Sequence, residues 1–324
     1  MKQETTTNLA VDIKGLVKVF GDNRAVDGVD LQVATGSIYG VLGPNGAGKS
    51  TVINMLATLM KPDAGTARVF GHDVVEESQI VRQLIGVTGQ AATVDESLSA
   101  TENLIIFGRL LGLSKPEARQ KATELLDEFG LSEAAKRPLS KFSGGMRRRL
   151  DLAASLIAQP PLIFLDEPTT GLDPRTRNQM WDTIRKLVSK GSTILLTTQY
   201  LEEADQLADR IAVIDHGKVI AEGTGSELKA SIGTATLQLG LVSKQDLAKA
   251  TQITQKVLGV HATNPSEKQI SAPMANPDLI TDLLVALRTS KIHLAQVSVQ
   301  EPTLDEVFLT LTGKPQTAEK GATE

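Results

Sequence analysis

Alternating apolar and polar positions open the chain. Residues 11–20 (VDIKGLVKVF) and 26–33 alternate as half-buried β-strands do. Residues 37–42 (SIYGVL) form a short apolar run that leads directly into a glycine-rich turn, and a helical pattern begins at Ser50. A strand, a glycine turn and a helix in this order are typical of the start of an α/β nucleotide-binding unit.

Two later apolar runs, 162–165 (LIFL) and 193–197 (TILLT), have the continuous hydrophobicity of parallel strands covered on both faces. Between the turn and these strands, residues 95–158 have a mostly helical pattern. Ser99 and Ser114 are each followed three residues later by glutamate, which is the signature of a capping box at a helix start. The pattern therefore predicts a helical subdomain inserted into an α/β core.

A domain boundary is predicted after Gly225, so that residues 1–225 form one domain and residues 226–312 a second. The second domain has a strand–helix pattern of the βαβαβα type, and we expect a small α+β domain of ordinary size. Its expected strands are 234–241, 268–271 and 292–299, and its expected helices are 244–258, 277–289 and one that begins at Thr303. The polar tail, 313–324, is predicted to be disordered.

Composition narrows the classes of function. The chain has 324 residues, is 41% hydrophobic and 22% charged, and has a net charge of −4 with a pI of about 5.7. This acidic balance argues against nucleic acid as a partner. The chain does have a local basic run, Arg147–Arg149, which we interpret as a solvated helix face. Without cysteine the chain has no disulfides or thiolate sites, which suits a reducing cytoplasm. The most apolar window, 104–113, is too short to span a bilayer, so no direct membrane insertion is expected.

The glycine-rich turn is a Walker A loop. Its glycines allow successive backbone N–H groups to point at phosphates, and the helix that follows adds its positive end. We expect Lys49 to reach the β- and γ-phosphates of ATP and the Ser50 hydroxyl to ligate Mg²⁺. The loop consists of Gly43, Pro44, Asn45, Gly46, Ala47, Gly48, Lys49, Ser50 and Thr51.

Two carboxylates follow the apolar run 162–165. The first, Asp166, is placed where Mg²⁺ binds, and the second, Glu167, lies where it can accept a proton from an attacking water. A pair of this kind can also cap a helix after a strand. Together with the Walker A loop, the pair predicts a metal-site residue and a general base.

A third motif carries a family resemblance. The stretch 141–147 (KFSGGMR) contains Ser143, Gly144 and Gly145 at a predicted helix start, which favours an anion site. It closely resembles the signature sequence of ATP-binding cassette proteins. The resemblance implies a P-loop ATPase core and a head-to-tail homodimer, in which the signature of one subunit completes the ATP site of the other.

Weaker positions match this family in order over residues 11–223. Phe20 stands at the aromatic position that stacks on adenine, where Tyr is more common. Gln90 falls at the Q-loop position, which the family uses near Mg²⁺ and the attacking water, and Asp173 falls in the D-loop, which crosses the dimer interface. The permease contact is expected in residues 91–103.

One position departs from the family pattern. Gln199 follows the strand 193–197 where the family has its switch histidine. A glutamine amide can hydrogen-bond the γ-phosphate or orient water, but it cannot become cationic. We therefore expect retained ATP binding, tolerance of Gln199→His, and hydrolysis without the pH dependence of a switch histidine.

The stretch 197–215 and the stretch 301–309 (EPTLDEVFL) are similar to the ATP-binding subunits of daunorubicin/doxorubicin resistance exporters, which share the glutamine. This resemblance implies a subunit on the cytoplasmic face of the cell membrane, bound to a separate ABC-2 type permease that exports a hydrophobic drug. The stretch 301–309 could equally be a capped helix that packs its own domain or a regulatory and dimer-bracing element.

Two alternatives remain open at this point. An ATPase subunit of an uptake transporter, or of a lipid or polysaccharide exporter, would share every catalytic residue. Translation factors of this family generally carry two cassettes in one chain, and repair ATPases interrupt the cassette with a long coiled coil. Each motif occurs once here and the gap between Gln90 and Ser143 is short, so these two classes are disfavoured.

Overall fold

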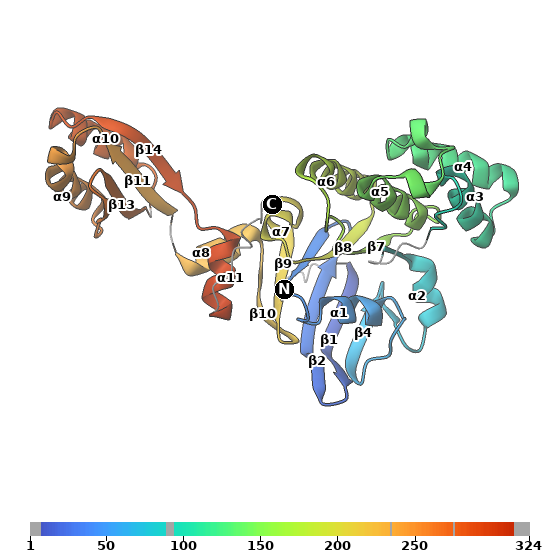
Figure 1. The fold of residues 1–324 in the computed structure, drawn as a ribbon. Coiled ribbons are helices and arrows are strands. Elements are labelled where there is room, and N and C mark those ends of the chain that lie inside the picture. Colours follow the sequence, from blue (N-terminus) through green and yellow to red (C-terminus); the bar gives the residue numbers. More distant parts are fainter. Residues whose placement is uncertain (1–7, 89–93, 234, 275, 314–324) are drawn as a thin grey trace, which may run out of the picture. The chain divides into compact units, whose positions relative to one another are not determined.

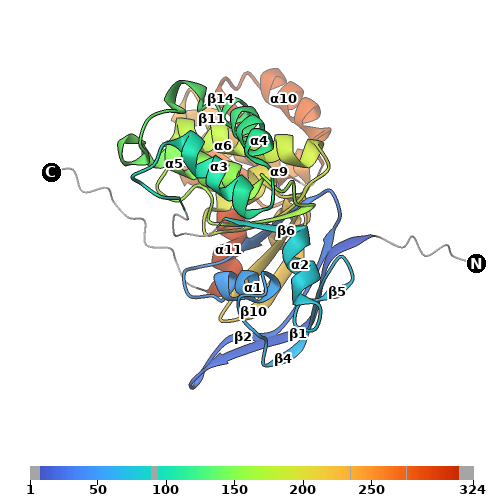
Figure 2. The same cartoon turned by 90° about the vertical axis from the view of Figure 1, so that its right-hand side faces the viewer.

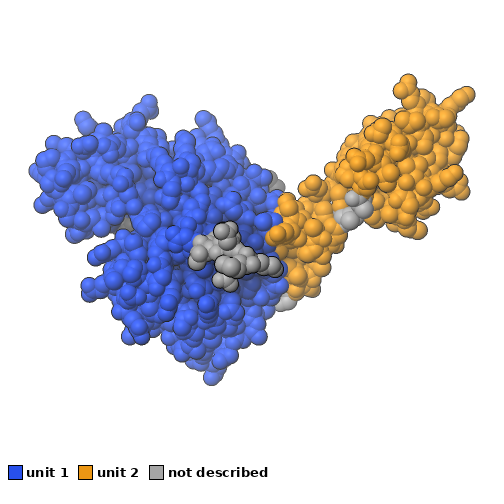
Figure 3. Space-filling view, turned by 180° about the vertical axis from the view of Figure 1, so that it is seen from behind, with its two compact units in different colours: residues 1–225 blue, residues 226–324 orange. Residues whose placement is uncertain are grey.

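The computed structural model describes residues 8–88, 94–233, 235–274 and 276–313. The chain divides into two compact units, residues 1–225 and 226–324 (Figure 3). The first unit contains two clusters of buried apolar side chains and the second contains one. Among the described residues, no helix combines the length and the apolar character that a membrane crossing requires.

A six-stranded sheet forms the centre of the first unit, with the strand order β10-β9-β3-β8-β7-β6 (Figure 1). Its neighbouring strands run parallel except for β9 and β10, which are antiparallel. The central strands β3, β7 and β8 are buried at every position, as their continuous apolar pattern predicts. The strands are β3 (Ile38–Leu42), β6 (Ile85–Thr88), β7 (Leu162–Asp166), β8 (Thr193–Thr198), β9 (Arg210–Asp215) and β10 (Lys218–Gly223).

A second, antiparallel sheet has the order β2-β1-β4-β5. Its strands are β1 (Leu9–Phe20), β2 (Asn23–Ala34), β4 (Ala64–Val69) and β5 (His72–Asp73). Helix α1 (Lys49–Leu56) contacts β2, β4 and β7, and its buried side chains join one hydrophobic cluster with those of both sheets. This cluster fixes the start of α1 against the end of β3.

The first unit also contains a helical subdomain. In it, α3, α4 and α5 lie side by side (Figures 1 and 2). The capping boxes predicted at Ser99 and Ser114 are confirmed, because each serine accepts from a backbone N–H and the glutamate three residues on accepts in return. The helices of the first unit after α1 are α2 (Ser78–Leu84), α3 (Ala100–Leu110), α4 (Lys115–Glu128), α5 (Gly144–Ser155), α6 (Pro174–Ser189) and α7 (Leu201–Leu207), with short 3-10 turns at Ser132–Ala134 and Leu139–Lys141.

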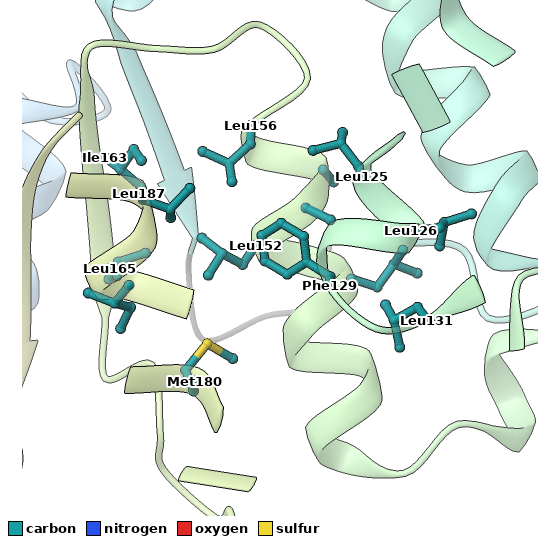
Figure 4. Close-up of a cluster of buried hydrophobic side chains, with 14 of the residues drawn as sticks. Leu125, Leu126, Phe129, Leu131, Leu152, Leu156, Ile163, Leu165, Met180 and Leu187 are labelled. Atoms are coloured by element: carbon teal, nitrogen blue, oxygen red, sulfur yellow. The ribbon is translucent and has the colours of Figure 1, made fainter. Parts of the chain in front are cut away.

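Helix α5 joins the helical subdomain to the six-stranded sheet. In Figure 4, Leu152 of α5 lies next to Phe129, which follows α4, and the cluster continues to Leu165 of β7 and Met180 of α6. All four residues are at least 98% buried. Truncating one such side chain typically costs about 2–5 kcal/mol. Helix α5 is therefore packed against the sheet that carries the catalytic motifs.

The second unit folds as β11-α9-β12-β13-α10-β14, and its sheet is antiparallel with the order β12-β13-β11-β14. This is the split βαβ arrangement of ferredoxin-like domains. Strand β12 was not expected from the sequence, because all four of its residues are exposed and polar or proline. The elements are α8 (Gly225–Ile232), β11 (Ala235–Leu241), a 3-10 turn (Lys244–Asp246), α9 (Leu247–Leu258), β12 (Thr263–Ser266), β13 (Gln269–Met274), α10 (Leu279–Thr289), β14 (Leu294–Gln300) and α11 (Leu304–Thr312).

Helix α11 covers the stretch 301–309 in part. Thr303 and Glu306 form the expected capping box. Leu304, Val307 and Phe308 are buried on one face of the helix, while Leu311 is 38% exposed. The tail predicted to be disordered lies, apart from Gly313, outside the described residues.

Candidate functional site

Three neighbouring parallel strands of the first unit end at the same edge of the sheet. In the register of β3 and β8, Leu42 pairs with Thr198, and in the register of β7 and β8, Asp166 pairs with Thr197. The Walker A loop follows β3, Glu167 follows β7, and Gln199 follows β8. Ligands of open α/β sheets bind at this carboxyl edge.

The glycines of the Walker A loop meet their neighbours closely. A Cβ at Gly43 would lie 2.2 Å from the carbonyl oxygen of Ile214, and a Cβ at Gly48 would lie 2.2 Å from that of Ala25. Gly48 also has a φ of 104°, in the region that glycine tolerates, and it is the N-cap of α1. The loop therefore packs tightly and presents the first turn of α1, which starts at Lys49 and not at Ser50, to an anion.

Lys49 is folded back onto its own loop. Its Nζ donates to the carbonyl oxygens of Gly43 at 2.8 Å and Pro44 at 3.1 Å. Glu167 Oε1 lies 3.5 Å from the same nitrogen. Burial lowers the pKa of Lys49, while the charges of Glu167 and Asp166 oppose the shift. The ammonium group thus lies beside the proposed general base, in a place where it can exchange these oxygens for phosphate.

Asp166 binds two hydroxyl groups. Ser50 Oγ donates to Asp166 Oδ1 at 3.1 Å, and Thr197 Oγ1 donates to the same oxygen. The carboxylate is 8% exposed. The serine and the aspartate predicted to form the metal site are therefore brought into contact from α1 and β7.

Glu167 has an unusual backbone. Its φ of 49° lies in the left-handed region, which costs a non-glycine residue on the order of 1–3 kcal/mol. Its N–H donates to the carbonyl oxygen of Thr197 at 3.1 Å and contacts the Thr197 hydroxyl at 3.2 Å. Thr170 Oγ1 donates to Glu167 Oε2 at 3.2 Å. The conformation turns the carboxylate toward Lys49.

Arg148 of α5 binds the backbone of the same turn. One Nη donates to the carbonyl oxygens of Asp166 at 2.6 Å and Glu167 at 3.2 Å, and Nε donates to that of Pro168 at 3.2 Å. Arg149 donates to the carbonyl oxygen of Phe129 at 3.1 Å. Burial lowers the pKa of both guanidinium groups. The interpretation of Arg147–Arg149 as a solvated face is wrong, because all three side chains are partly buried.

The signature residues have distinct environments. Ser143 caps α5 by accepting from Met146 N–H at 3.3 Å. Gly144 is exposed and a Cβ there would meet nothing within 4 Å. At Gly145, by contrast, a Cβ would lie 2.3 Å from Thr176 Cγ2. The second glycine is therefore required for packing against α6, and only the first leaves an open approach.

Asp173 is the N-cap of α6. Its Oδ1 accepts from Thr176 N–H at 3.0 Å, and its Oδ2 accepts from the Thr176 hydroxyl at 2.6 Å. These bonds lower the pKa of Asp173. The D-loop aspartate is thus occupied with capping its own helix and does not line the cavity described next.

One cavity of about 920 Å³ brings most of the predicted residues together. Phe20 lies in its wall with 47% of its surface exposed, and Lys18 Nζ is 5.7 Å from the ring centre. Gln199 lies in the wall with Lys49 and Glu167. The lining residues are Phe20, Asn23, Ala25, Asn45, Gly46, Gly48, Lys49, Ser50, Thr51, Gly144, Arg147, Arg148, Asp151, Glu167, Thr170, Gly171, Leu172 and Gln199.

Some predicted residues lie outside this wall. Gly43, Pro44 and Ala47 of the Walker A loop do not line the cavity, and neither does Asp166, which accepts a hydrogen bond from Ser50. Gln90 lies outside the described residues, as do residues 91–93 of the expected permease contact.

A buried carboxyl group lies next to this site. Glu203 of α7 is fully buried and accepts from Trp181 Nε1 at 3.2 Å. Burial raises the pKa of Glu203, while the hydrogen bond from Trp181 opposes the shift. Glu203 thus joins helix α7 to helix α6 through this buried hydrogen bond.

Sequence reasoning missed three groups at the site: Thr197, Thr170 and Arg148. The two threonines carry no motif of their own, and their position follows only from the strand register and the turn. The run Arg147–Arg149 is evident in the sequence, but three consecutive arginines do not reveal which one faces the sheet. The only feature of the sequence that pointed to Arg148 was its position, five residues after the helix-capping serine Ser143.

Comparison with known proteins agrees with this geometry. Residues 26–170 match the family described as ABC transporter, and residues 223–312 match the family described as ATP-binding protein DrrA1-3-like, C-terminal domain. The chain is 56% identical over 312 residues to the daunorubicin/doxorubicin resistance ATP-binding protein DrrA of Streptomyces peucetius, which covers 96% of this chain and 94% of that protein. It is 36% identical over 311 residues to the linearmycin resistance ATP-binding protein LnrL of Bacillus subtilis, with coverage of 93% and 97%.

Solved structures show the same fold for the first unit. The ADP conformation of an ATP-binding cassette of an ABC transporter matches with a TM-score of 0.60 and 27% identity, over 68% of this chain and 92% of that chain. A dimeric cassette in a post-hydrolysis state, bound to ADP and Pi, matches with a TM-score of 0.61 and 27% identity, over 66% and 98%. The expected P-loop ATPase core with a helical subdomain is confirmed. The chain belongs to the ABC transporter family, as an ATP-binding and ATP-hydrolysing subunit of the daunorubicin/doxorubicin resistance type.

Proposed function

We propose that this protein powers an ABC-2 type exporter, in which a separate permease expels a hydrophobic drug or antibiotic. The observation that carries the proposal is the likeness across both units: the relatives named for drug resistance match over 93% or more of the chain, including the C-terminal domain. The protein would act at the cytoplasmic face of the cell membrane, held there by the permease.

The site supports ATP hydrolysis by a general base. Lys49 would bind the β- and γ-phosphates, and Phe20 would stack on the adenine ring at the exposed wall of the cavity. Glu167, held 3.5 Å from Lys49, would accept a proton from the attacking water. Gln199 would hydrogen-bond the γ-phosphate or orient this water, and Gln90 would act near it from the Q-loop.

Magnesium fits the residues present. Ser50 and Asp166 offer oxygen atoms 3.1 Å apart at the phosphate loop, and Gln90 is the third proposed ligand. The described residues contain no group of three or more His, Cys, Asp or Glu side chains that could hold a metal. Mg²⁺ usually binds through one or two carboxylates together with substrate phosphates, and it would neutralise phosphate charge here.

We also propose that the active form is a head-to-tail homodimer. Ser143 and Gly144 are exposed at the start of α5, where they can meet the nucleotide of a second copy. A cassette with a similar fold has been solved as a dimer. Asp173 would lie at the interface, and residues 91–103 would contact the permease.

The test uses Glu167→Gln in the full-length protein. The amide keeps the shape of the carboxylate but cannot accept the proton, so hydrolysis should fall about 100-fold or more while ATP still binds. Size-exclusion chromatography with Mg²⁺ and ATP should then show a stable dimer, and Lys49→Ala should remain monomeric. A Glu167→Gln protein that stays monomeric at saturating ATP would contradict the mechanism.

Transport itself requires the permease. Co-expression with its permease in drug-sensitive cells should lower the accumulation of a fluorescent anthracycline, and Glu167→Gln should abolish this effect. Unchanged accumulation of every drug tested, with ATPase activity intact, would argue against drug export and leave the ATPase assignment standing.

A further inference from the structure

Arg148 links the signature helix to the turn that carries the proposed general base. Its guanidinium group donates to three consecutive carbonyl oxygens, those of Asp166, Glu167 and Pro168, at 2.6–3.2 Å. These bonds reach only main-chain atoms. They hold the peptide units that follow Asp166, Glu167 and Pro168, including the one after the strained residue Glu167.

The opposite side of the same turn is held by β8. The N–H of Glu167 donates to Thr197 at 3.1 Å. A φ of 49° is unfavourable for glutamate and persists only where surrounding contacts impose it. Thr197 and Arg148 hold the N–H and the carbonyl oxygen of the peptide before Glu167, and Arg148 also holds the carbonyl oxygen of the peptide after it. Without Arg148, the turn could relax toward an ordinary φ and carry the carboxylate away from Lys49.

We propose that Arg148 is a positioning residue for hydrolysis, which sets the backbone of Glu167 from helix α5. Because the signature serine Ser143 is the N-cap of α5, a shift of this helix when the signature engages a nucleotide would reach Glu167 directly. The proposal rests on the role of Glu167 as general base given above.

The test compares Arg148→Met with Arg149→Met in the full-length protein. Methionine keeps an unbranched apolar stem and removes the donors. We expect Arg148→Met to lower kcat for ATP about 10- to 100-fold while KM stays within about threefold, as is typical when a supporting contact of a catalytic group is lost. Arg149→Met loses its bond to Phe129 inside the helical subdomain, and its kcat should stay near that of the wild type.

Arg148→Lys provides the conservative variant. Its single ammonium group cannot donate in the fork geometry of a guanidinium group, so its kcat should lie between those of Arg148→Met and the wild type. If Arg148→Met does not fold, as judged by Trp181 fluorescence, the lysine variant decides: a kcat below about one third of the wild-type value supports the proposal. A kcat equal to that of the wild type in the folded variants overturns it, as does an equal loss of kcat in Arg149→Met.

A rise of KM that accounts for the whole loss would also overturn the proposal, because Arg148 would then act in nucleotide binding. Glu167→Gln separates the two assignments. If Glu167→Gln hydrolyses ATP normally, the role of Glu167 is wrong, whatever Arg148 does. If Glu167→Gln is inactive and Arg148→Met is fully active, only the positioning role fails.

Discussion

At the scale of single residues, the two signature glycines differ in what a methyl group would meet. The site of a Cβ at Gly145 is filled by Thr176 Cγ2, while that at Gly144 is open. Thr176 is itself fixed by two hydrogen bonds to Asp173, so it cannot move aside cheaply. The need for glycine at 145 is therefore steric and lies within one chain.

We predict that Gly145→Ala lowers the free energy of unfolding by about 1–3 kcal/mol through overpacking. Thr176→Ser removes Cγ2 but keeps the hydroxyl that binds Asp173, so the double variant should recover most of the loss. Gly144→Ala is the matched control and should change stability by less than about 1 kcal/mol. Urea denaturation checks this, and equal losses at both glycines would show that the contact with Thr176 is not the cause.

Glu203 gives a prediction about pH. Burial raises its pKa above the ordinary value of 4.5, so the folded chain holds this proton more tightly than the unfolded chain. Stability from this group is then fully present below pH 4.5 and is lost as pH rises through the folded pKa. Glu203→Gln keeps an oxygen for Trp181 and has no charge to desolvate.

The Gln variant should therefore be more stable than the wild type at pH 8, and the difference should shrink toward pH 4.5. Urea titrations at several pH values, followed by fluorescence of Trp181, measure it, because Trp181 is the only tryptophan and bonds Glu203 directly. A difference that is constant with pH, or a less stable variant at pH 8, would contradict the assignment of the shift to Glu203.

At the scale of elements, the sequence pattern predicts the strands that carry the motifs well. β3, β7 and β8 are short, mainly apolar and bounded by glycine, proline or polar residues, so local pattern and tertiary position agree. In β12 the local pattern and the tertiary position do not agree. Its sequence, TNPS, has no alternation of apolar and polar residues and no buried face, and it is a strand only because it pairs with β13. Short exposed edge strands are invisible to hydrophobic periodicity.

The residues of the site also fall into two groups, those that the sequence pattern predicts and those that it does not. Lys49, Asp166 and Glu167 were predictable because their chemistry fixes the spacing of residues within one loop or turn. Arg148 and Thr197 reach the same turn across 18 and 30 residues of sequence, and only the packing of α5 and the register of β8 reveal them. A side chain that binds a main-chain carbonyl group leaves no pattern in the sequence of the segment that it binds, because every residue has this group.

Helix α11 has two acidic residues in its first turn, and only one of them takes part in the capping box. Glu306 accepts from Thr303 N–H at 3.0 Å as part of the capping box, so its replacement would weaken the helix itself. Asp305 is exposed and has no part in that box. Asp305 is therefore the cleaner probe of a regulatory or dimer-bracing role for the stretch 301–309.

At the scale of the whole molecule, the tryptophan and the two tyrosines report on one unit. Trp181, Tyr39 and Tyr200 all lie in residues 1–225. Intrinsic fluorescence therefore follows the unfolding of the unit that contains the ATP cavity, while circular dichroism at 222 nm follows both units. The two signals together separate effects of nucleotide on one unit from effects on the other.

We predict that Mg²⁺ and ATP at 100 times the dissociation constant raise the free energy of unfolding measured by fluorescence by about 2.7 kcal/mol. Lys49→Ala should lose this gain, because the gain comes from binding to the folded loop alone. Urea denaturation at fixed protein concentration measures both. An equal gain in the Lys49→Ala protein would mean that the nucleotide binds elsewhere.

The three bonds from Arg148 to carbonyl oxygens have a consequence for divergence among relatives. Every amino acid carries the same carbonyl group, so the side chains at 166–168 can change over generations without breaking this contact. Position 148 has no such freedom, because only a forked donor of that length serves three oxygens at once. Selection on this contact would therefore act on position 148 alone. Within a lineage, changes at position 148 would show no correlation with changes at positions 166–168.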